Sequence, residues 1–485
     1  MTAALRVEDY RALLSAALPR AQDADTVHPT VNTLFTPDSH RLALEPDTTV
    51  VQGGRGVGKT FWFRSLLDPL LREVAAQEYR IDRLRELEVA AGYGAALVPD
   101  RYPGSAELRS LVDSGANPYE LWTTVLLVAL GHRDLAAVGS WKDKIAWVRD
   151  HPGDRDRTIA AADRRAQAEG KVCLVLFDAL EHLHLDRRQA DRLVAGILQL
   201  ALELRLSTRN IRCKIFIRPD MFDGALLHFP DASKLTSNAA SLKWTPANLY
   251  GLFFHYLGND RAPLAADFRS MRPGWDETTA GRHVPPASLL GDEEVQSEAF
   301  TALAGSYMGA NFRKGYTYTW LPNHLMDGAE QVSPRSFLDA LSKAVEETIA
   351  QYAGHEYAIH HEGIRRGVQS ASRTRVGEIR EDLPWVQTAI EPLNGQQVPI
   401  EEDLVVSLWG ESGLTAALQA EAESTAAEED VRTGPRHADR YPGLIEELID
   451  LGVMRRRKDG RIDLPDVYRI AFSIGRKGGV PKVKT

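Results

Sequence analysis

The sequence predicts an α/β protein in which a parallel sheet precedes helical regions and a C-terminal winged helix. Three observations support this fold class. A glycine-rich loop at residues 53–60 follows a short β-branched strand and opens an apolar-periodic helix. The apolar runs 171–178 and 213–217 are typical of strands buried on both faces of a parallel sheet. Strand and helix patterns alternate between and around these runs, as parallel pairing requires.

Length and composition limit the class of protein. The 485 residues are enough for about three domains, each with its own core. The net charge of −9 excludes a molecule that binds nucleic acid through its overall charge, so any such binding has to be local. Cys173 and Cys213 lie inside apolar runs and are expected to be core residues, which suits a reducing cytosol.

Targeting signals are not expected. The N-terminus carries acidic residues and has no uninterrupted apolar stretch, so the sequence indicates no signal peptide. No stretch of about 18 apolar residues would cross a membrane. We therefore expect a cytoplasmic protein without a membrane partner.

The elements of the first half follow in order. Thr245-Pro246 has the N-cap and first-turn proline of a helix start, and Glu169-Gly170 has the glycine of a helix end. The expected helices and strands are a helix at 8–18, a loop-rich lead-in at 19–46, a strand at 48–52, a helical stretch at about 60–90, a weak strand at 95–98, helices at 117–131 and 141–169, a strand at 171–178, a helix at 187–206, strands at 213–217 and 241–244, and a helix through residue 257.

The composition changes at residue 258. Residues 259–298 are rich in Pro, Gly and charge and predict an insertion or loop, whereas residues 419–438 are acidic, of low complexity, and predict a mobile linker or exposed helix. Further helices are expected at 298–310, 334–352, 361–382 and 440–451, and a hairpin with a type I′ turn at Asp459-Gly460 is expected over 453–464. The predicted domains are a helical lead-in (1–46), the core with the glycine loop (47–257), an insertion with a helical lid (258–355), a helical linker domain (356–418), an acidic linker (419–438), and a winged helix with a basic tail (439–485).

The glycine loop matches G-x-x-x-x-G-K-[ST], the P-loop that surrounds a nucleotide's phosphates. Its glycines let backbone N–H groups point at a polyphosphate, and the next helix adds its positive N-terminal dipole. Lys59 would reach the β- and γ-phosphates, and the Thr60 hydroxyl would hold Mg²⁺. The alternative is a glycine-rich turn with an incidental lysine. The candidate nucleotide-binding residues are Gly53, Gly54, Arg55, Gly56, Val57, Gly58, Lys59, Thr60 and Phe61.

A P-loop needs a carboxylate at the end of a neighbouring strand to position Mg²⁺ and water. Asp178 ends the apolar run 171–178 and is the candidate second metal ligand, unless it only caps a helix. Glu181 is the candidate general base that polarises water, with a surface acid at a helix start as the alternative. His182 and His184 are expected to be structural histidines.

Two arginines complete the candidate catalytic set. Arg218 ends the strand 213–217, and the carboxyl ends of parallel strands line the ligand crevice, where a cation can stabilise phosphate charge. The alternative for Arg218 is a pair with Asp220. Arg335 begins the helix 334–352 and is expected to reach the phosphates from a second domain, unless its role is structural.

This set of motifs resembles the AAA+/STAND group of P-loop NTPases, the signal-transduction ATPases, with origin-recognition-type ATPases as near relatives. The resemblance covers about residues 30–355. It implies a sensor-one role for Arg218 and a sensor-two role for Arg335. Asp178-Ala179-Leu180-Glu181 is similar to the group's Asp-Gly-hydrophobic-Asp motif.

The chain departs from the group at Ala179, where a glycine or an acid is usual, and at His182, where signalling members often have glutamate. Fast hydrolysis is therefore not expected, because the group that activates water is displaced. Arg187, Arg188 and Arg192 are candidates for an inter-subunit arginine finger by position alone.

The helix 440–451 and the hairpin 453–464 resemble a winged helix, which such chains often carry after the lid. Residues 453–485 hold ten basic and three acidic side chains, a local balance of +7. Within the wing, Arg455, Arg456, Arg457 and Lys458 could contact a phosphate backbone. The alternative is a winged helix that packs on the ATPase core as a regulator. The other basic residues are Arg461, Arg469, Arg476, Lys477, Lys482 and Lys484.

The resemblance implies an ATP-binding switch or slow ATPase that uses ATP, ADP and Mg²⁺. Its nucleotide state would control binding to a protein partner or separate effector chain, or homo-oligomerisation, in a bacterial defence or signalling system. One alternative is an AAA+ ATPase that binds duplex DNA through the winged helix. A second alternative is a scaffold that holds nucleotide without hydrolysing it.

Overall fold

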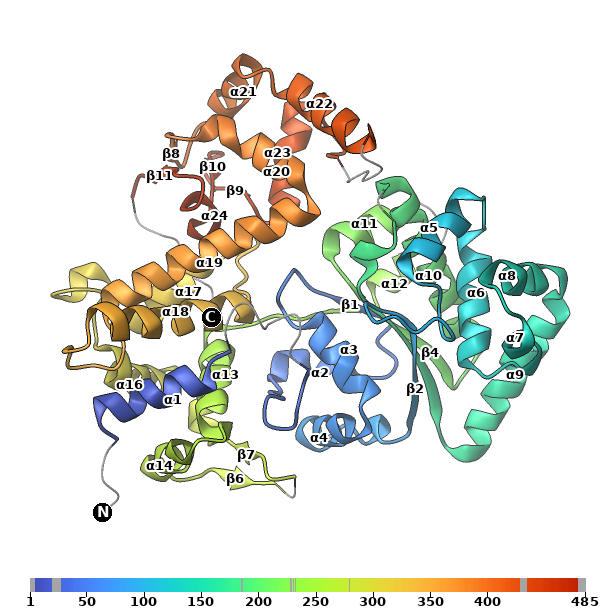
Figure 1. Cartoon of the computed structure of the whole chain (residues 1–485), viewed down its shortest axis with the longest axis horizontal. Coiled ribbons are helices and arrows are strands. Elements are labelled where there is room, and N and C mark those ends of the chain that lie inside the picture. The colour runs from blue at the N-terminus through green and yellow to red at the C-terminus, as the bar shows by residue number, and fades with distance from the viewer. Residues whose placement is uncertain are drawn as a thin grey trace. The chain divides into compact units, whose positions relative to one another are not determined.

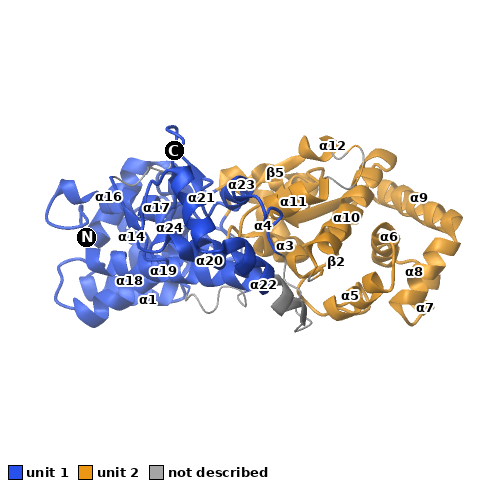
Figure 2. Cartoon of the chain, turned by 90° about the horizontal axis from the view of Figure 1, so that it is seen from above, with its two compact units in different colours: residues 1–35, 244–485 blue, residues 36–243 orange. Residues whose placement is uncertain are grey.

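The computed structural model describes residues 5–19, 28–184, 186–226, 229, 231, 233–278, 280–427 and 434–478. The chain forms two compact units (Figure 2). Unit 2 comprises Thr36–Lys243, and unit 1 comprises Met1–Phe35 with Trp244–Thr485. The predicted α/β class with a parallel sheet is confirmed, whereas the division into six domains remains a prediction.

A five-stranded parallel sheet forms the centre of unit 2 (Figure 1). The strand β3 is buried at every residue, as its continuous apolar sequence predicts. The order across the sheet is β2 (Leu87–Tyr93), β3 (Val172–Phe177), β4 (Ile211–Ile217), β1 (Val50–Gln52) and β5 (Ala239–Ser241).

Helices cover both faces of this sheet. On β4, Ile215 and Ile217 belong to a core cluster that includes Trp122 and Leu193. The residue between them, Phe216, instead meets Phe63 of the helix α3 edge-on at 6.4 Å between ring centroids. Successive side chains of β4 therefore pack on opposite faces of the sheet, as expected of a strand that is buried on both faces.

The predicted strand at 95–98 and the continuous helical stretch at 60–90 are wrong. The helix α3 (Lys59–Leu67) ends at Asp68, whose Oδ1 accepts hydrogen bonds from the amides of Leu70 and Leu71 and starts α4 (Pro69–Tyr79). The strand in this part of the chain is β2, which ends before residue 95. It lies at the sheet edge and is only partly buried, so its sequence lacks the strong apolar signal of β3.

The remaining helices of unit 2 surround the sheet. The predicted helix 141–169 is two helices, because Pro152 begins a new one after His151. The elements are η2 (Asp38–His40), α2 (Arg41–Leu44), η3 (Asp82–Leu84), α5 (Ser105–Asp113), α6 (Pro118–Ala129), α7 (Arg133–Ala137), α8 (Trp141–Asp150), α9 (Pro152–Glu169), η4 (Leu180–His182), α10 (Arg187–Ser207), α11 (Pro219–Leu226) and α12 (Ser233–Thr236).

Unit 1 joins the N-terminal helix α1 (Val7–Ala17) to elements far along the chain. The Arg11 guanidinium donates hydrogen bonds to the carbonyls of Ala353, His355, Tyr357 and Ala358. Residues 259–298 are not a long loop, since they contain two helices, a short hairpin and the start of a third helix. The elements are α13 (Pro246–Asn259), α14 (Pro263–Met271), β6 (Asp276–Glu277), β7 (His283–Val284), α15 (Ala287–Gly291), α16 (Glu293–Ala304), η5 (Phe312–Lys314) and α17 (Thr317–Leu325).

Two long helices, α18 (Pro334–Gln351) and α19 (His361–Asp382), pack closely in unit 1. Gly367 makes the close approach possible, because a Cβ there would lie 2.0 Å from the Ala340 carbonyl oxygen. In the described residues of both units, no helix has the length and hydropathy to cross a bilayer.

The C-terminal part has its own hydrophobic core, drawn from residues between Leu383 and Ile474. The predicted helix and hairpin at the C-terminus are present, but the type I′ turn is wrong. Asp459 does not have a positive φ, whereas Gly460 has φ +88°, so the loop is a turn closed by a left-handed glycine. The elements are α20 (Pro384–Ile390), η6 (Glu391–Leu393), β8 (Gln397–Val398), α21 (Glu402–Glu411), α22 (Leu414–Ala427), α23 (Tyr441–Asp450), β9 (Arg455–Arg456), β10 (Ile462–Asp463), α24 (Asp466–Arg469) and β11 (Gly475–Arg476).

Part of the predicted acidic linker, residues 428–433, lies outside the described residues, as do Lys482 and Lys484 of the basic tail. Residues 419–427 of the same segment belong to α22.

Candidate functional site

The glycine loop connects β1 to α3 in unit 2, the strand-loop-helix context that its sequence predicts. The amide of Gly53 donates to the Ile217 carbonyl at 3.0 Å, which joins the start of the loop to the end of β4. Gly53 cannot carry a side chain without a shift, because a Cβ would lie 2.5 Å from Val57 Cγ2. Gly58 caps α3 with φ 106°. The first amides of α3 therefore follow a left-handed glycine and have no acceptor within the helix.

Lys59 folds back over its own loop. Its Nζ donates to the carbonyl oxygens of Gly53 and Gly54, each at 2.9 Å. Burial lowers the pKa of Lys59, and the nearby charges of Glu181 and Asp178 oppose that shift. The ammonium group therefore lies among the acids that the sequence analysis associated with it.

Asp178 follows the last residue of β3, and its amide donates to the Tyr93 carbonyl of β2 at 3.1 Å. The residue is 2% exposed. Burial raises the pKa of its carboxyl to about 6, the charge of Glu181 acts in the same direction, and a hydrogen bond from the Thr60 side chain opposes them. The expectation that this acid ends a strand next to β1 is wrong, because β4 lies between β1 and β3. Thr60 nevertheless contacts Asp178 across that strand.

Ala179 has a left-handed backbone, with φ 57° and ψ 36°. This conformation suits glycine, and it costs a residue with a Cβ about 1–2 kcal/mol. The glycine that the family resemblance associates with this position therefore has a physical reason here. The chain turns sharply after Asp178 and enters η4, which carries Glu181.

Glu181 is exposed, as is His182. The Glu181 charge acts on Lys59, on Asp178 and on the buried Tyr93 phenol, whose pKa is raised to about 12, chiefly by burial. His184 is held at the edge of this region, because its Nε2 lies 3.2 Å from Asp113 Oδ1 and its Nδ1 accepts from the Asp186 amide at 2.9 Å. Glu181 is therefore an exposed acid whose charge acts on both Lys59 and Asp178.

Arg218 directly follows β4 and pairs with Asp220 at two points. Nε lies 3.0 Å from Oδ1, and Nη2 lies 3.2 Å from Oδ2. This is the alternative that the sequence left open for Arg218. Burial raises the pKa of Asp220, but Arg218 and then Arg187 outweigh it, so the pKa is lowered overall. The Arg218 charge also lowers the pKa of Lys59, which indicates that the two cations are close.

Arg335 lies in the first turn of α18, in unit 1. Its Nη1 is 2.9 Å from Glu378 Oε1 on α19. The other carboxylate oxygen of Glu378 pairs with Arg375 at 3.3 Å, and Arg375 Nε donates to the Tyr468 hydroxyl at 3.2 Å. These bonds hold Arg335 within unit 1 in a network that connects α18, α19 and α24.

One contact next to the glycine loop has no sequence signal. The indole Nε1 of Trp62, on α3, donates to His40 Nδ1 at 3.0 Å, and both residues are buried. Burial lowers the pKa of His40 to about 3, so the imidazole is neutral and can accept this bond. The contact attaches the helix of the P-loop to the preceding segment.

The arginines of the C-terminal hairpin and tail are paired within the protein. Arg456 pairs with Glu402 and Glu446, and Arg461 pairs with Asp459. The buried carboxylates Asp463 and Asp466 bind the others: Arg455 and Arg457 pair with Asp463, Arg469 with Asp466, and Arg476 with both. These arginines therefore stabilise the C-terminal part internally.

In the described ranges, no cluster of three or more His, Cys, Asp or Glu side chains could hold a metal ion. A magnesium site at Thr60 and Asp178 would therefore need oxygens from a phosphate and from water, which is how Mg²⁺ binds beside nucleotides.

No family model and no curated protein sequence matches the chain. Among solved structures, it is similar to the ORC2 protein of Aeropyrum pernix, described as ADPNP-ADP complexes, with 12% identity, a TM-score of 0.37 and coverage of 88% of this chain and 86% of that chain. A likeness at this level carries no inference about activity.

Proposed function

We propose that the chain binds Mg²⁺–ATP at the glycine loop and works as a nucleotide-dependent switch or slow ATPase of the AAA+/STAND type. The contact between Thr60 and Asp178 carries the proposal. Both side chains have the chemistry of magnesium ligands, and they come from β1–α3 and from β3, elements more than 100 residues apart in the sequence.

The residues present fit a phosphate and a divalent cation. Asp178 is buried with a pKa of about 6, so near pH 7 it holds a costly charge that a cation would stabilise. The loop amides and the N-terminus of α3 would bind phosphate oxygens. Lys59 would exchange the carbonyls of Gly53 and Gly54 for the phosphates, and Thr60 with Asp178 would hold Mg²⁺. When bound, the cation supplies charge that offsets the phosphate oxygens.

Slow turnover follows from the partners of the candidate catalytic groups. Lys59 is bonded to its own loop, Arg218 to Asp220 and Arg335 to Glu378. Each cation has to give up an internal partner before it can stabilise phosphate charge. Glu181 would accept the proton of the attacking water, but it comes three residues after Asp178 on a strained turn.

Such a protein is suited to a switch. Nucleotide binding would rearrange the pairs of Lys59 and Arg218 in unit 2 and those of Arg335 in unit 1, and the altered surfaces would bind a protein partner, an effector chain or a second copy. The internal pairing of the hairpin arginines gives the DNA-binding alternative no specific support.

The test is nucleotide binding, measured by titration with a fluorescent ATP analogue and Mg²⁺. Lys59→Ala is expected to abolish binding, whereas Lys171→Ala, an exposed lysine that pairs with Glu169 before β3, should bind as the unaltered protein does. Equal binding by both variants would exclude the glycine loop as the site. If Lys59→Ala abolishes binding but Glu181→Gln leaves phosphate release unchanged, the results favour the second alternative, a scaffold that holds nucleotide without hydrolysing it.

A further inference from the structure

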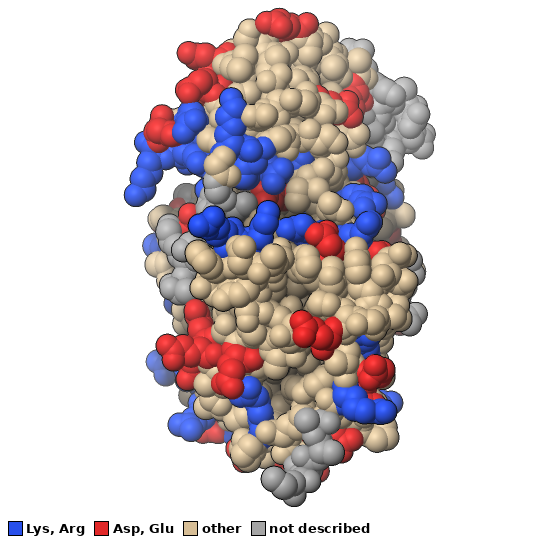
Figure 3. Space-filling model, turned by 90° about the vertical axis from the view of Figure 1, so that its left-hand side faces the viewer, with Lys and Arg blue, Asp and Glu red and all other residues tan. Residues whose placement is uncertain are grey.

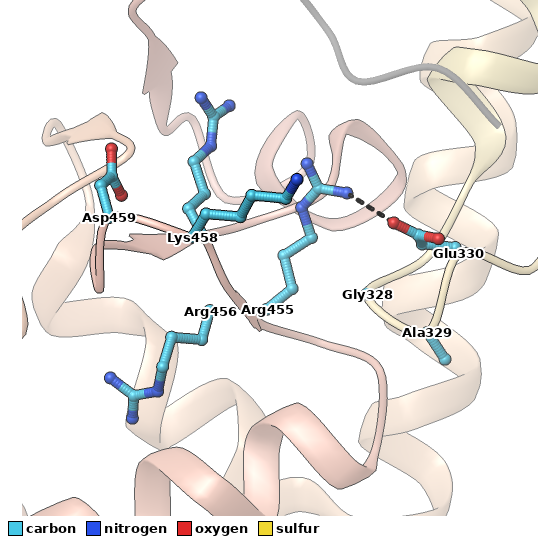
Figure 4. A pocket seen from close by; sticks show the side chains of 8 residues that line it. Gly328, Ala329, Glu330, Arg455, Arg456, Lys458 and Asp459 are labelled. Carbon is cyan, nitrogen blue, oxygen red and sulfur yellow. Dashed lines mark ion pairs between the residues drawn. The ribbon is translucent and has the colours of Figure 1, made fainter. Parts of the chain in front are cut away.

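A second basic site lies in unit 1, outside the residues assigned to ATP. A cavity of about 750 Å³ separates the loop after α17 from the hairpin β9–β10. Figure 4 shows the loop on one side and the hairpin on the other. Its lining consists of Gly328, Ala329, Glu330, Arg455, Arg456, Arg457, Lys458 and Asp459.

The loop wall is fixed to the turn between α23 and β9. The Gly328 amide donates to the Gly452 carbonyl at 2.7 Å, and a Cβ on Gly328 would lie 2.2 Å from the Met454 carbonyl oxygen. Asp327 Oδ1 also accepts from the amides of Ala329 and Gln331, at 3.0 and 2.9 Å. These contacts fix the position of the loop wall relative to the residues just before β9.

The cavity has a positive excess, because four of its lining residues are cationic and two are acidic. Arg456 and Arg457 are committed to Glu402 and Asp463. Arg455 pairs with Asp463 through Nε, at 3.5 Å from Oδ2, whereas its Nη1 lies 3.9 Å from Glu330 Oε1, beyond hydrogen-bond distance. Lys458 is exposed, and Figure 4 draws no ion pair for it.

Arg455 and Lys458 lie on the same side of the hairpin. In the view of Figure 4, Arg455 and Lys458 extend toward the side of Glu330, whereas Arg456 extends the opposite way. More broadly, Figure 3 shows Lys and Arg side chains gathered in a band across one face of the molecule, with acidic groups above and below.

We infer that this cavity binds a compact anion with adjacent phosphate groups, through Arg455 and Lys458, in competition with the Glu330 carboxylate. Its volume is that of a small-molecule site, about 300–1,000 Å³. Arginine and lysine are the side chains that proteins use for phosphate oxygens. Glu330 acts as an internal anion that occupies Arg455 until a ligand with more charge replaces it.

The test uses inorganic tripolyphosphate and, in a second arm, ATP, each titrated by calorimetry at low ionic strength. Both arms use the full chain with Lys59→Ala, so that the glycine loop does not contribute. Tripolyphosphate is expected to bind at one site. Comparison with ATP distinguishes an inorganic polyphosphate from a nucleotide as the source of the phosphates, since a nucleotide site should favour ATP.

Three further substitutions in that background identify the site. Lys458→Glu should weaken binding by about tenfold or more, as loss of a charge-assisted contact predicts. Glu330→Gln should strengthen binding, because it removes the competing carboxylate. Lys314→Ala, at an exposed lysine of η5 outside the lining, is the control and should change the affinity by less than about twofold.

The inference is overturned if neither anion binds, or if Lys458→Glu and Glu330→Gln leave the affinity unchanged. It is also overturned if duplex DNA binds this face and tripolyphosphate does not compete with the DNA. The site would then bind the backbone of a polymer. Circular dichroism of each variant checks that the fold is retained.

Discussion

The Arg218 guanidinium and the Asp220 carboxylate form a two-point ion pair at the end of β4, with distances of 3.0 and 3.2 Å. The side chains are 14% and 15% exposed, so each charge depends on the other. The same pair adjoins the glycine loop, because the Gly53 amide donates a hydrogen bond to the carbonyl of Ile217, the residue before Arg218. A structural role and a catalytic role for Arg218 therefore have to be separated by experiment.

Arg218→Ala is expected to lower the free energy of unfolding by about 3 kcal/mol, because it leaves Asp220 as a poorly compensated buried charge. Arg218→Met with Asp220→Asn removes both charges and should recover most of that loss. If Arg218 also stabilises phosphate charge, the double variant regains stability but not phosphate release. Recovery of both would show that the arginine is structural only. Urea unfolding and a phosphate-release assay measure the two quantities.

Ala179→Gly is expected to stabilise the protein by about 0.5–1 kcal/mol, since glycine adopts φ 57° without the cost that a Cβ imposes. The matched control is Ala190→Gly within the helix α10, which should destabilise by about 1 kcal/mol. Both are measured by urea unfolding without nucleotide. A loss of stability at residue 179 comparable to that at residue 190 would contradict the strained turn.

Asp178 gives the protein a specific pH dependence. Burial raises the pKa of its carboxyl from 3.8 to about 6, so between these values the folded state binds more protons than the unfolded state. Stability without nucleotide or Mg²⁺ therefore falls as pH rises from about 4 to 6, by on the order of 2–3 kcal/mol from this group.

Asp178→Asn should remove this contribution and be more stable than the unaltered protein above pH 6, while losing Mg²⁺-dependent nucleotide binding. Asp100→Asn, at an exposed position, is the control and should keep the original pH profile. The difference between profiles isolates the group, because the buried His40 and His255, whose pKa values are lowered to about 3, contribute equally to each. Equal stability of both variants at pH 7 would contradict the prediction.

Arg335 and Arg375 share the carboxylate of Glu378 but differ in burial, so their substitutions should differ. Arg375→Ala removes a buried cation that also bonds the Tyr468 hydroxyl, and should cost about 3 kcal/mol or more. Arg335→Ala leaves Glu378 paired with Arg375 and should cost about 1 kcal/mol or less. A sensor role for Arg335 requires that this variant lose phosphate release while its unfolding midpoint stays nearly unchanged.

The sequence was sufficient where a single segment decides the structure. The uninterrupted apolar residues of β3, the mostly apolar residues of β4, and the glycines between β1 and α3 predict these elements without reference to the rest of the chain. The strand β2 was missed because it is an edge strand, and its residues Ala90, Ala91 and Gly92 lack apolar bulk. The partners of Lys59, Arg218 and Arg335 depend on how segments meet in space, so the sequence could only offer alternatives for them.

The hairpin arginines show the same limit, and they change how DNA binding should be tested. Simultaneous Arg455→Glu, Arg456→Glu and Arg457→Glu would place new carboxylates beside Asp463, which is fully buried and pairs with two of the three residues. That triple variant is expected to lose several kcal/mol of stability, because a buried charge loses its partners. Loss of DNA binding by it would not distinguish a DNA contact from an unfolded C-terminal part.

Lys458→Glu with Lys477→Glu is the sharper test, since both lysines are exposed and their substitution leaves the arginine–carboxylate pairs intact. We expect the melting temperature of this double variant to equal that of the unaltered protein within error. The melting temperature of the triple arginine variant should be clearly lower, and thermal unfolding measures both. If the triple variant is as stable as the unaltered protein, the pairs of Asp463 contribute little and the arginines are available to a ligand. If it unfolds as expected, only the lysine variant can report on a phosphate backbone.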